Sequence, residues 1–441
     1  MPIISTSVSV SNTRALTITV DGNYLITAPT VLESENSYAV GISADIGAVT
    51  INLAGSIVSS LSYYGIYQAG SGDPLTLNIL SSGSIFGGAV LFTTSQLALT
   101  NYGYLYGQDS GIASGSAADS VINRGEIFTT SGLAIELGDG ADVLTNAGHI
   151  TGEISLGLGD DRFYGGGGSV LGIIDFSSGN DLIDLRGAQV DGTIYGGVGN
   201  DTFMVDGTSF DLVEMAFAGT DLVKSTVNFE LGANFESLQL LGAGDIDGTG
   251  NILANTLTGN AGANRLHGSS GSDKLYGGAG DDRLFGDTGN DSEFGGMGSD
   301  VLSGGAGNDV LTGDTGEDRL IGGVGRDVLT GDTGVSGGYD DVFVFQKTTD
   351  SANSALSDRI ADFHIGEDKI DLSAIDARSA TAANDAHTFI TTAFTNVAGQ
   401  LRLQTSAGNT YVLGDVTGDG AADFRIILTG NLALTAADFI L

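Results

Sequence analysis

The stretch that decides the fold is residues 277–285, Gly277-Gly278-Ala279-Gly280-Asp281-Asp282-Arg283-Leu284-Phe285, one copy of a nine-residue repeat. From residue 259 onward, glycine recurs at the first and fourth positions, aspartate at the sixth and leucine at the eighth. The first-position glycines include Gly277, Gly286, Gly295, Gly304, Gly313 and Gly322, and the fourth-position glycines include Gly280, Gly289, Gly298, Gly307, Gly316 and Gly325. Consecutive copies in phase predict stacked coils, because one copy cannot bury its apolar side chain alone.

The sixth-position aspartates predict a metal site. Two nonapeptides should complete one coil, so that every second aspartate stacks in the same column. One column is Asp282, Asp300 and Asp318, and the other is Asp273, Asp291, Asp309 and Asp327. Stacked carboxylates repel unless a cation lies between them, and calcium takes about 6–8 oxygen ligands. We expect several Ca²⁺ ions in residues 259–345, held by these aspartates and by carbonyls of the glycine positions, which turn tightly because glycine adopts positive φ.

A solvated Gly/Asp-rich linker is the alternative, but it would not keep leucine at every ninth place. Glu293 is the exception among the eighth-position leucines. Because a buried unpaired carboxylate is costly, we expect a local distortion, with Glu293 turned to solvent or bound to a cation and Phe294 as the compensating apolar contact. Replacing Glu293 with leucine should then be neutral or stabilising.

The composition supports a metal-binding β-protein. The 441 residues carry a formal charge of −38, which excludes nucleic acid as a partner class and disfavours docking on anionic lipid. So large an excess of like charge favours bound cations. There are 71 glycines and no cysteine or tryptophan, so the chain has no disulfide and resembles turn-rich β-structure. We expect no transmembrane segment, and residues 1–8 do not resemble a Sec signal peptide.

The N-terminal half carries a second, longer repeat. Apolar β-rich segments recur about every 20 residues, each followed by an aspartate, and Asn101, Asn123 and Asn146 precede glycines at similar spacing. The aspartates are Asp142, Asp161, Asp181 and Asp201, which we interpret as turn or calcium positions. Such a period predicts a parallel β-solenoid with one coil per repeat. An antiparallel sandwich remains the alternative, with looser turn signals.

The predicted fold class is therefore all-β, a parallel β-solenoid (β-helix) leading into a β-roll with a C-terminal β-rich cap. Four parts are expected along the chain. They are a solenoid in residues 1–205, a β-rich connecting segment in 206–258, the calcium-binding repeats in 259–345 and a compact C-terminal domain in 346–441.

The repeats resemble the hemolysin-type calcium-binding (RTX) family, and the C-terminal third is similar to the C-terminal domain of serralysin metalloproteases. The likeness is carried by residues 341–345 (DVFVF), 358–363 (DRIADF), 366–373 (GEDKIDLS) and 436–441 (AADFIL). The resemblance implies a parallel β-roll, secretion through a type I apparatus with an uncleaved C-terminal signal, and calcium positions at Asp341, Asp350 and Asp358. The protease motif H-E-x-x-H is absent from the sequence, so protease activity is not implied.

No convincing catalytic constellation is evident. Arg162 and Arg186 do not share a coil position, and His149 is interpreted as a solvated turn residue. Residues 415–423 resemble part of an EF-hand loop but lack the final glutamate, so a β-turn between two strands is favoured. We expect a secreted, extracellular or cell-surface-associated calcium-binding protein, non-enzymatic and acting in a surface, matrix or adhesion role. The alternative is a polysaccharide-active lyase or epimerase using the face of residues 30–205. Expected partners are calcium, the type I secretion apparatus and extracellular polysaccharide or a cell surface.

Overall fold

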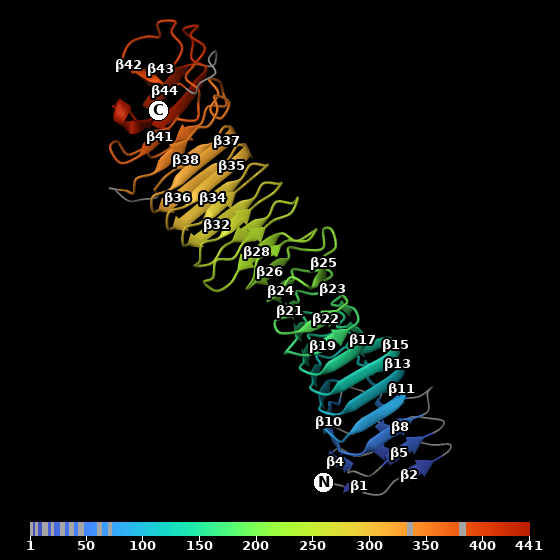
Figure 1. Cartoon of the computed structure of the whole chain (residues 1–441). Coiled ribbons are helices and arrows are strands. Elements are labelled where there is room, and N and C mark those ends of the chain that lie inside the picture. The colour runs from blue at the N-terminus through green and yellow to red at the C-terminus, as the bar shows by residue number, and fades with distance from the viewer. Residues whose placement is uncertain are drawn as a thin grey trace. The chain divides into compact units, whose positions relative to one another are not determined.

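The computed structural model is an all-β protein in the residues that it describes, and a parallel β-solenoid, as the sequence predicts. It describes residues 3–4, 8–10, 16–18, 22–26, 31–34, 39–42, 48–59, 64–68, 73–332, 338–378 and 385–441. The chain forms two compact units, Met1–Val223 and Lys224–Leu441. Figure 1 shows the strands of each unit stacked along its own length. The division into four parts remains a prediction, and strand β26 (Leu222–Ser225) lies at the boundary of the two units.

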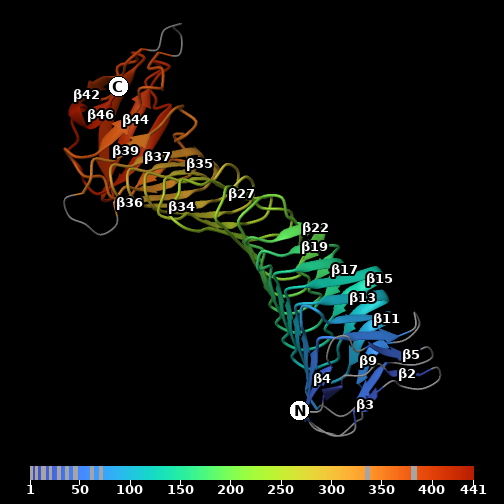
Figure 2. The same ribbon diagram turned by 60° about the horizontal axis from the view of Figure 1, so that its bottom comes forward.

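The first unit is built from two parallel sheets, and in each coil the chain adds one strand to the first sheet and one or two to the second. The first sheet contains β1 (Ile3–Ile4), β4 (Gly22–Ile26), β7 (Val49–Leu53), β10 (Leu75–Ile79), β12 (Leu97–Asn101), β14 (Ser120–Asn123), β16 (Val143–Asn146), β18 (Arg162–Tyr164), β21 (Leu182–Asp184) and β24 (Thr202–Val205). The second contains β2 (Val8–Val10), β3 (Leu16–Ile18), β5 (Val31–Ser34), β6 (Val40–Ile42), β8 (Ser56–Ser59), β9 (Tyr64–Gln68), β11 (Ser84–Thr93), β13 (Tyr104–Ala113), β15 (Glu126–Glu136), β17 (His149–Ser155), β19 (Ser169–Leu171), β20 (Ile174–Asp175), β22 (Gln189–Asp191), β23 (Thr193–Tyr195) and β25 (Asp211–Val213). Strands β11, β13, β15 and β17 lie side by side in Figure 2.

The register confirms the longer repeat. Asn101 pairs with Asn123, and Asn123 with Asn146, on successive strands. Their side chains form a buried ladder, in which each Nδ2 donates to the next Oδ1 at 2.8 and 2.9 Å. Ile154 pairs with Ile174 and Ile174 with Ile194, and these side chains fill the interior. Alternate residues of each strand face inward, which gives the solenoid its core.

The second unit continues the same construction in shorter coils. One sheet contains β28 (Ser237–Leu240), β30 (Thr256–Thr258), β32 (Lys274–Ala279), β34 (Ser292–Met297), β36 (Val310–Thr315), β38 (Val328–Thr330), β40 (Arg359–Ile360), β42 (Thr388–Ile390), β43 (Gln400–Ser406), β44 (Asn409–Asp415) and β45 (Phe424–Thr429). The other contains β27 (Phe229–Glu230), β29 (Gly248–Thr249), β31 (Arg265–His267), β33 (Arg283–Phe285), β35 (Val301–Gly307), β37 (Arg319–Gly325), β39 (Val342–Val344), β41 (Lys369–Asp371) and β46 (Phe439–Ile440). A 3-10 helix, Ala436–Asp438, precedes β46.

Each nonapeptide except residues 286–294, which carry Glu293, supplies one inward leucine, as the repeat predicts. Leu275, Leu284 and Leu302 are fully buried. The eighth-position leucines of the other repeats are buried in the same way. Some strands extend beyond the apolar positions of the repeat, since β35 and β37 run on into the turn and pair with each other there. The turn backbone thereby satisfies amide groups that would otherwise lie unpaired.

The expected distortion at Glu293 is wrong. Strand β34 is regular, and Glu293 pairs with Leu275 on one side and Leu311 on the other. Its side chain is fully buried, and burial raises the pKa of the carboxyl well above its usual range. Phe294 does not compensate from inside, because its ring stacks on Tyr276 at 5.1 Å between centroids on the partly exposed face. The uninterrupted strand pairing holds Glu293 inward, at the expense of burying its carboxyl group.

Replacing Glu293 with leucine should stabilise the protein. The substitution removes two carboxyl oxygens that have no hydrogen-bond partner and restores the side chain of the neighbouring coils. We expect a gain of about 1 kcal/mol or more in the free energy of unfolding, measured by chemical denaturation in calcium. Glu317→Leu, at an exposed turn position, is the control and should change little. A destabilised Glu293→Leu protein would contradict this expectation.

The C-terminal residues combine parallel and antiparallel pairing. Strands β43, β44 and β45 form an antiparallel meander, while β40 and β41 extend the two solenoid sheets. The loop between β44 and β45 is a turn, as favoured from the sequence. Asp415 accepts from the Gly418 amide at 2.6 Å, and Asp423 accepts from the Val416 amide at 2.7 Å, so both carboxylates close the loop locally. Within the described residues, no helix has the length and apolar character to cross a membrane.

Candidate metal centre

The aspartates of the nonapeptides form the two predicted columns. In one column the Asp282 amide donates to Asp300 Oδ1 at 2.7 Å, and the Asp300 amide donates to Asp318 Oδ1 at 2.8 Å. The same bond links Asp273, Asp291, Asp309 and Asp327 in the other column, at 2.8–2.9 Å. Each coil of this block is thus joined to the next by two such bonds, one in each column.

The second carboxylate oxygen of most column aspartates is buried without a hydrogen-bond partner. In the second unit this holds for Oδ2 of Asp273, Asp282, Asp291, Asp300, Asp309, Asp318, Asp327, Asp341 and Asp358. A buried polar atom without a partner is rare and calls for a ligand. Rows of such oxygens are the donor set of a hard cation, so the residues present fit calcium.

Glycine at the first repeat position has a different role from the one expected. Positive φ occurs at the second and fourth positions, as at Gly278 (110°) and Gly280 (104°), but Gly277 has no positive φ. A Cβ added to Gly277 would lie 2.5 Å from Asp282 Oδ2, and the first-position glycines of the other repeats also face their own aspartate. These glycines are required for space beside the carboxylate, not for a left-handed backbone.

The electrostatics of the columns also favour a cation. Burial, together with neighbouring carboxylates, raises the pKa of Asp282 to about 7 and that of Asp341 to about 8. The pKa of Asp358 rises to about 9, first through burial and then through Asp327. These groups therefore resist ionisation until positive charge lies beside them.

Both columns continue beyond the nonapeptides. Asp318 donates its amide to Asp341, and Asp341 donates to Asp368 at 3.2 Å. Asp327 donates to Asp358 at 2.8 Å, so the structure places Asp358 at the end of the second column. Asp350 is not a member, because its Oδ2 accepts from the amides of Gln346 and Lys347 in a local turn.

The first unit contains a single column of the same kind. The amide of each aspartate donates to Oδ1 of the following one at 2.6–2.8 Å, from Asp119 through Asp142, Asp161, Asp181 and Asp201 to Asp221. Oδ2 of the first five is buried without a partner. At its end, Asp201, Glu214 and Asp221 each bring one oxygen to within 4.8 Å of the others.

Sequence reasoning missed three members of these columns. Asp221 carries the same signal as Asp201, a glycine two residues before it and an apolar residue two after it. Glu214 carries no such signal because its coil is shorter than the preceding one, with Leu212 following Ile194 by 18 residues where Ile194 follows Ile174 by 20. An insertion precedes Asp368. Only the register of the strands reveals them.

The calcium-free protein should become more stable on acidification. The folded columns hold pKa values above those of exposed aspartates, from about 6 at Asp300 to about 8 at Asp341, so the folded state binds more protons than the unfolded chain. The stabilisation that the protonated aspartates give to the folded state is fully present below pH 4 and is lost as the pH rises through 6–8. We expect a higher Tm at pH 5 than at pH 8 in chelator, measured by circular dichroism. In calcium the dependence should reverse, because protons compete for the ligands. A Tm in chelator that rises towards pH 8 would contradict this.

Polar groups also gather on the outer face of the first unit. Arg124, Glu126 and His149 line a cavity of about 500 Å³, and His149 with Ser169 lines a second of about 620 Å³. His149 begins strand β17 instead of lying in a turn, and its Nδ1 lies 2.6 Å from Ser169 Oγ. The register pairs Arg162 with Leu182 and not with Arg186, so these two arginines do not share a coil position.

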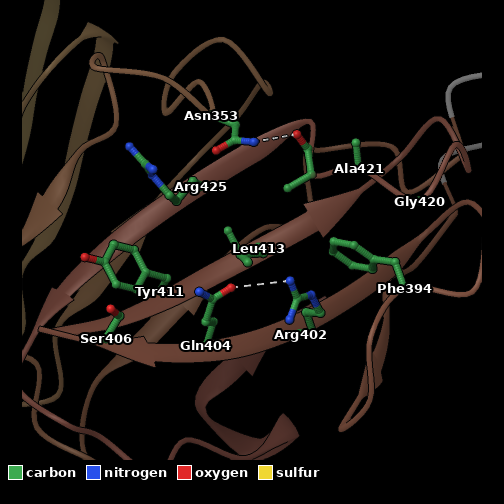
Figure 3. A pocket seen from close by; sticks show the side chains of 11 residues that line it. Asn353, Phe394, Arg402, Gln404, Ser406, Tyr411, Leu413, Gly420, Ala421 and Arg425 are labelled. Carbon is green, nitrogen blue, oxygen red and sulfur yellow. Dashed lines mark hydrogen bonds between the residues drawn. The ribbon is translucent and has the colours of Figure 1, made fainter.

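A further pocket of about 490 Å³ lies on the meander of the second unit. Figure 3 shows Arg402 and Arg425 over the sheet with Tyr411 and Phe394. Arg425 donates to Ser357 Oγ at 2.9 Å, and Arg402 packs over the Phe394 ring at 4.8 Å. The residues that line this pocket include no aspartate, glutamate or histidine, so the pocket offers no acid–base pair.

Comparisons with known proteins agree with this geometry. The family model described as RTX calcium-binding nonapeptide repeat (4 copies) matches residues 153–169, around Asp161. Repeats of this family bind calcium, so the predicted cofactor is confirmed. The match lies in the longer coils of the first unit, which the sequence ranked below the nonapeptide block.

Similar proteins cover only parts of the chain. Metalloprotease AprA of Pseudomonas entomophila (strain L48) is 42% identical over 97 residues, which are 21% of this chain and 19% of that protein. The chain therefore spans about a fifth of that relative. Two solved structures are the AlgE6R3 and AlgE6R2 subunits of the Azotobacter vinelandii mannuronan C5-epimerase, with 27% and 30% identity and a TM-score of 0.25 each. Each alignment covers 36% of this chain, with 78% and 88% of the respective subunit.

The family model described as Peptidase M10 serralysin C terminal matches residues 195–441. That match includes both aspartate columns of the second unit and the C-terminal meander. Because it extends over more than half of the sequence, the chain belongs to the serralysin C-terminal domain family.

Proposed function

We propose that the protein is a secreted, extracellular protein that folds on calcium, with the column aspartates and glycine-position carbonyls as ligands. The observation that carries the proposal is the row of buried, unpartnered Oδ2 atoms. Calcium supplies the positive charge that these atoms lack. The chain's own residues position the carboxylates. A backbone amide of the neighbouring coil donates to Oδ1, and the first-position glycine leaves space beside Oδ2.

Calcium-coupled folding fits an export route that passes unfolded chains. Proteins with RTX repeats are typically secreted by type I systems. The free calcium concentration inside a cell is far below the affinity of extracellular calcium modules, so the columns stay unneutralised there. Binding outside then stabilises the native state by mass action. The C-terminal residues 346–441 supply the export signal in this proposal.

Removing residues 346–441 should retain the protein in the cytoplasm, whereas deleting residues 1–205 should allow export. The measurement is the secreted fraction in cells that carry a type I apparatus. The truncation also removes Asp358 and Asp368, the last acceptors of the columns. A full-length control with Asp358→Asn and Asp368→Asn weakens the columns but keeps the signal, and it should still be exported. Normal secretion of the truncated protein would show that the signal lies elsewhere.

We propose polysaccharide binding as a second function, located on the outer face of the first unit. Four rings form a row across strands β11, β13 and β15. They are Phe86, Tyr104, Tyr106 and Phe128, with neighbouring centroids 5.5–6.5 Å apart. Sugar rings pack their C–H faces on such rings, while Arg124, Glu126 and His149 beside them can bond hydroxyls and carboxylates. Because these polar side chains are exposed, the face suits binding better than acid–base catalysis.

The test is retardation of the calcium-loaded protein in gels that contain a panel of neutral and acidic polysaccharides. Combined Tyr104→Ala and Tyr106→Ala substitutions should abolish retardation. Tyr276→Ala, which breaks a comparable stacked pair in the second unit, is the control. Retardation that survives the double substitution would exclude this face. Turnover of a polysaccharide in the same panel would instead favour the lyase or epimerase alternative.

A further inference from the structure

Glu214 lies where neighbouring coils of the first unit bury apolar side chains. It follows strand β25, whose Val213 pairs with Tyr195 of β23, and Tyr195 pairs with Asp175 of β20. The residues that follow these strands are Phe176, Gly196 and Glu214 in successive coils. Phe176 is fully buried, and Glu214 is only 4% exposed. A carboxylate has therefore replaced an inward apolar residue.

Gly196 in the adjacent coil makes this burial possible. A Cβ added there would overlap Glu214 Oε1 and come within 2.9 Å of Asp201 Oδ2. The missing side chain thus leaves a space that two carboxylates from different coils enter together. Glu214 and Gly196 form a matched pair, in which one residue supplies a charge and the other makes room for it.

Asp221 provides the third carboxylate. Its Oδ1 accepts the Asp201 amide at 2.8 Å, so it stands one coil beyond Asp201 in the column. Both aspartates are 1% exposed, and Asp201 Oδ2 has no hydrogen-bond partner and faces the space beside Gly196. Among the residues that the structure describes, this is the one group of three such side chains whose ligand atoms lie within 4.8 Å of one another.

We propose that Asp201, Glu214 and Asp221 form a calcium site that closes the aspartate column of the first unit. The donor set contains only oxygen, which suits a hard cation and not zinc or copper. Burial leaves little room for the water shell that magnesium retains, which favours calcium. The site rests on the proposed function for the identity of the ion. The carboxylate of Glu214, however, does not belong to the regular series of aspartates.

The test counts bound calcium per full-length chain by equilibrium dialysis. Glu214→Gln should bind one ion fewer than the wild type. Glu293→Gln is the matched control, because it changes another buried glutamate at an apolar position outside the three-carboxylate group, and it should keep the wild-type count. Circular dichroism in calcium verifies that each variant is folded.

Glu214→Leu guards against a folding defect of the glutamine variant, since an apolar side chain fills the equivalent place at Phe176. It should also bind one ion fewer. If a folded Glu214 variant keeps the wild-type count while the wild type binds calcium, this inference is overturned and the proposed function stands. If the wild type binds no calcium, both are overturned. Magnesium that occupies the site as tightly as calcium would overturn the choice of ion.

Discussion

At pH 8, chelation of calcium should abolish most of the far-ultraviolet β-signal of the second unit, and calcium at about 10⁻⁴–10⁻³ M should restore it. Without the ion, the columns bring buried carboxylates together with one oxygen of each left without a partner. Ionised, they repel across successive coils, and burial makes that repulsion stronger than in water.

The controls separate calcium from general screening of charge. Magnesium at the same concentration should restore little, because it demands a tighter and more rigid coordination. Asp300→Asn together with Asp318→Asn should raise the calcium concentration needed for refolding, while the asparagine found naturally at the sixth position of one repeat, Asn264, shows that the backbone accepts the amide. Equal β-content in chelator and in calcium would contradict the claim that the aspartate columns need calcium to fold.

Gly289→Ala should destabilise the second unit by about 3 kcal/mol or more. Gly289 adopts φ of 147°, and a Cβ there would overlap the carbonyl oxygen of Gly271 in the preceding coil. Because the obstacle is backbone held by the ladder, it cannot rotate away as a side chain would. A Cβ added at Gly307 would overlap the carbonyl oxygen of Gly289 in the same way. The substitution therefore conflicts with the close stacking of successive coils and not with one isolated contact.

Gly244→Ala is the matched control for this change. No atom lies within 4 Å of the added Cβ, and φ there is not positive, so the expected change is within about 0.5 kcal/mol. Thermal unfolding in saturating calcium measures both variants. If Gly289→Ala unfolds at the same temperature as Gly244→Ala, the coils are not packed as closely as the structure places them.

The spacing of the repeats was enough to predict the parallel coils and the two columns. Asp282 and Asp300 stand one coil apart because two nonapeptides return the chain to the same place. Leucine at the eighth position likewise predicted the core. What repeats in phase can be predicted, since each copy is subject to the same steric limits.

The reasons behind single residues were harder to predict. Glycine at the first and fourth positions looks alike in sequence, yet Gly277 provides space and Gly280 provides positive φ. Glu293 was expected to turn outward, but strand pairing on both sides outweighs the burial of one carboxyl group. Glu214 follows a shortened coil that breaks the period of 20 residues, so only its register beside Gly196 brings it to the column.

The hydrogen bonds of the columns all point the same way along the chain. Each aspartate amide donates to a carboxylate that comes later in the sequence, as from Asp300 to Asp318. In each coil, the aspartate amide therefore faces the coil that follows it in the sequence. The carboxylate Oδ1 of the same aspartate faces the coil that precedes it. Each column therefore has a direction, with Asp358 and Asp368 as the last acceptors, so these bonds can join two coils in one order only.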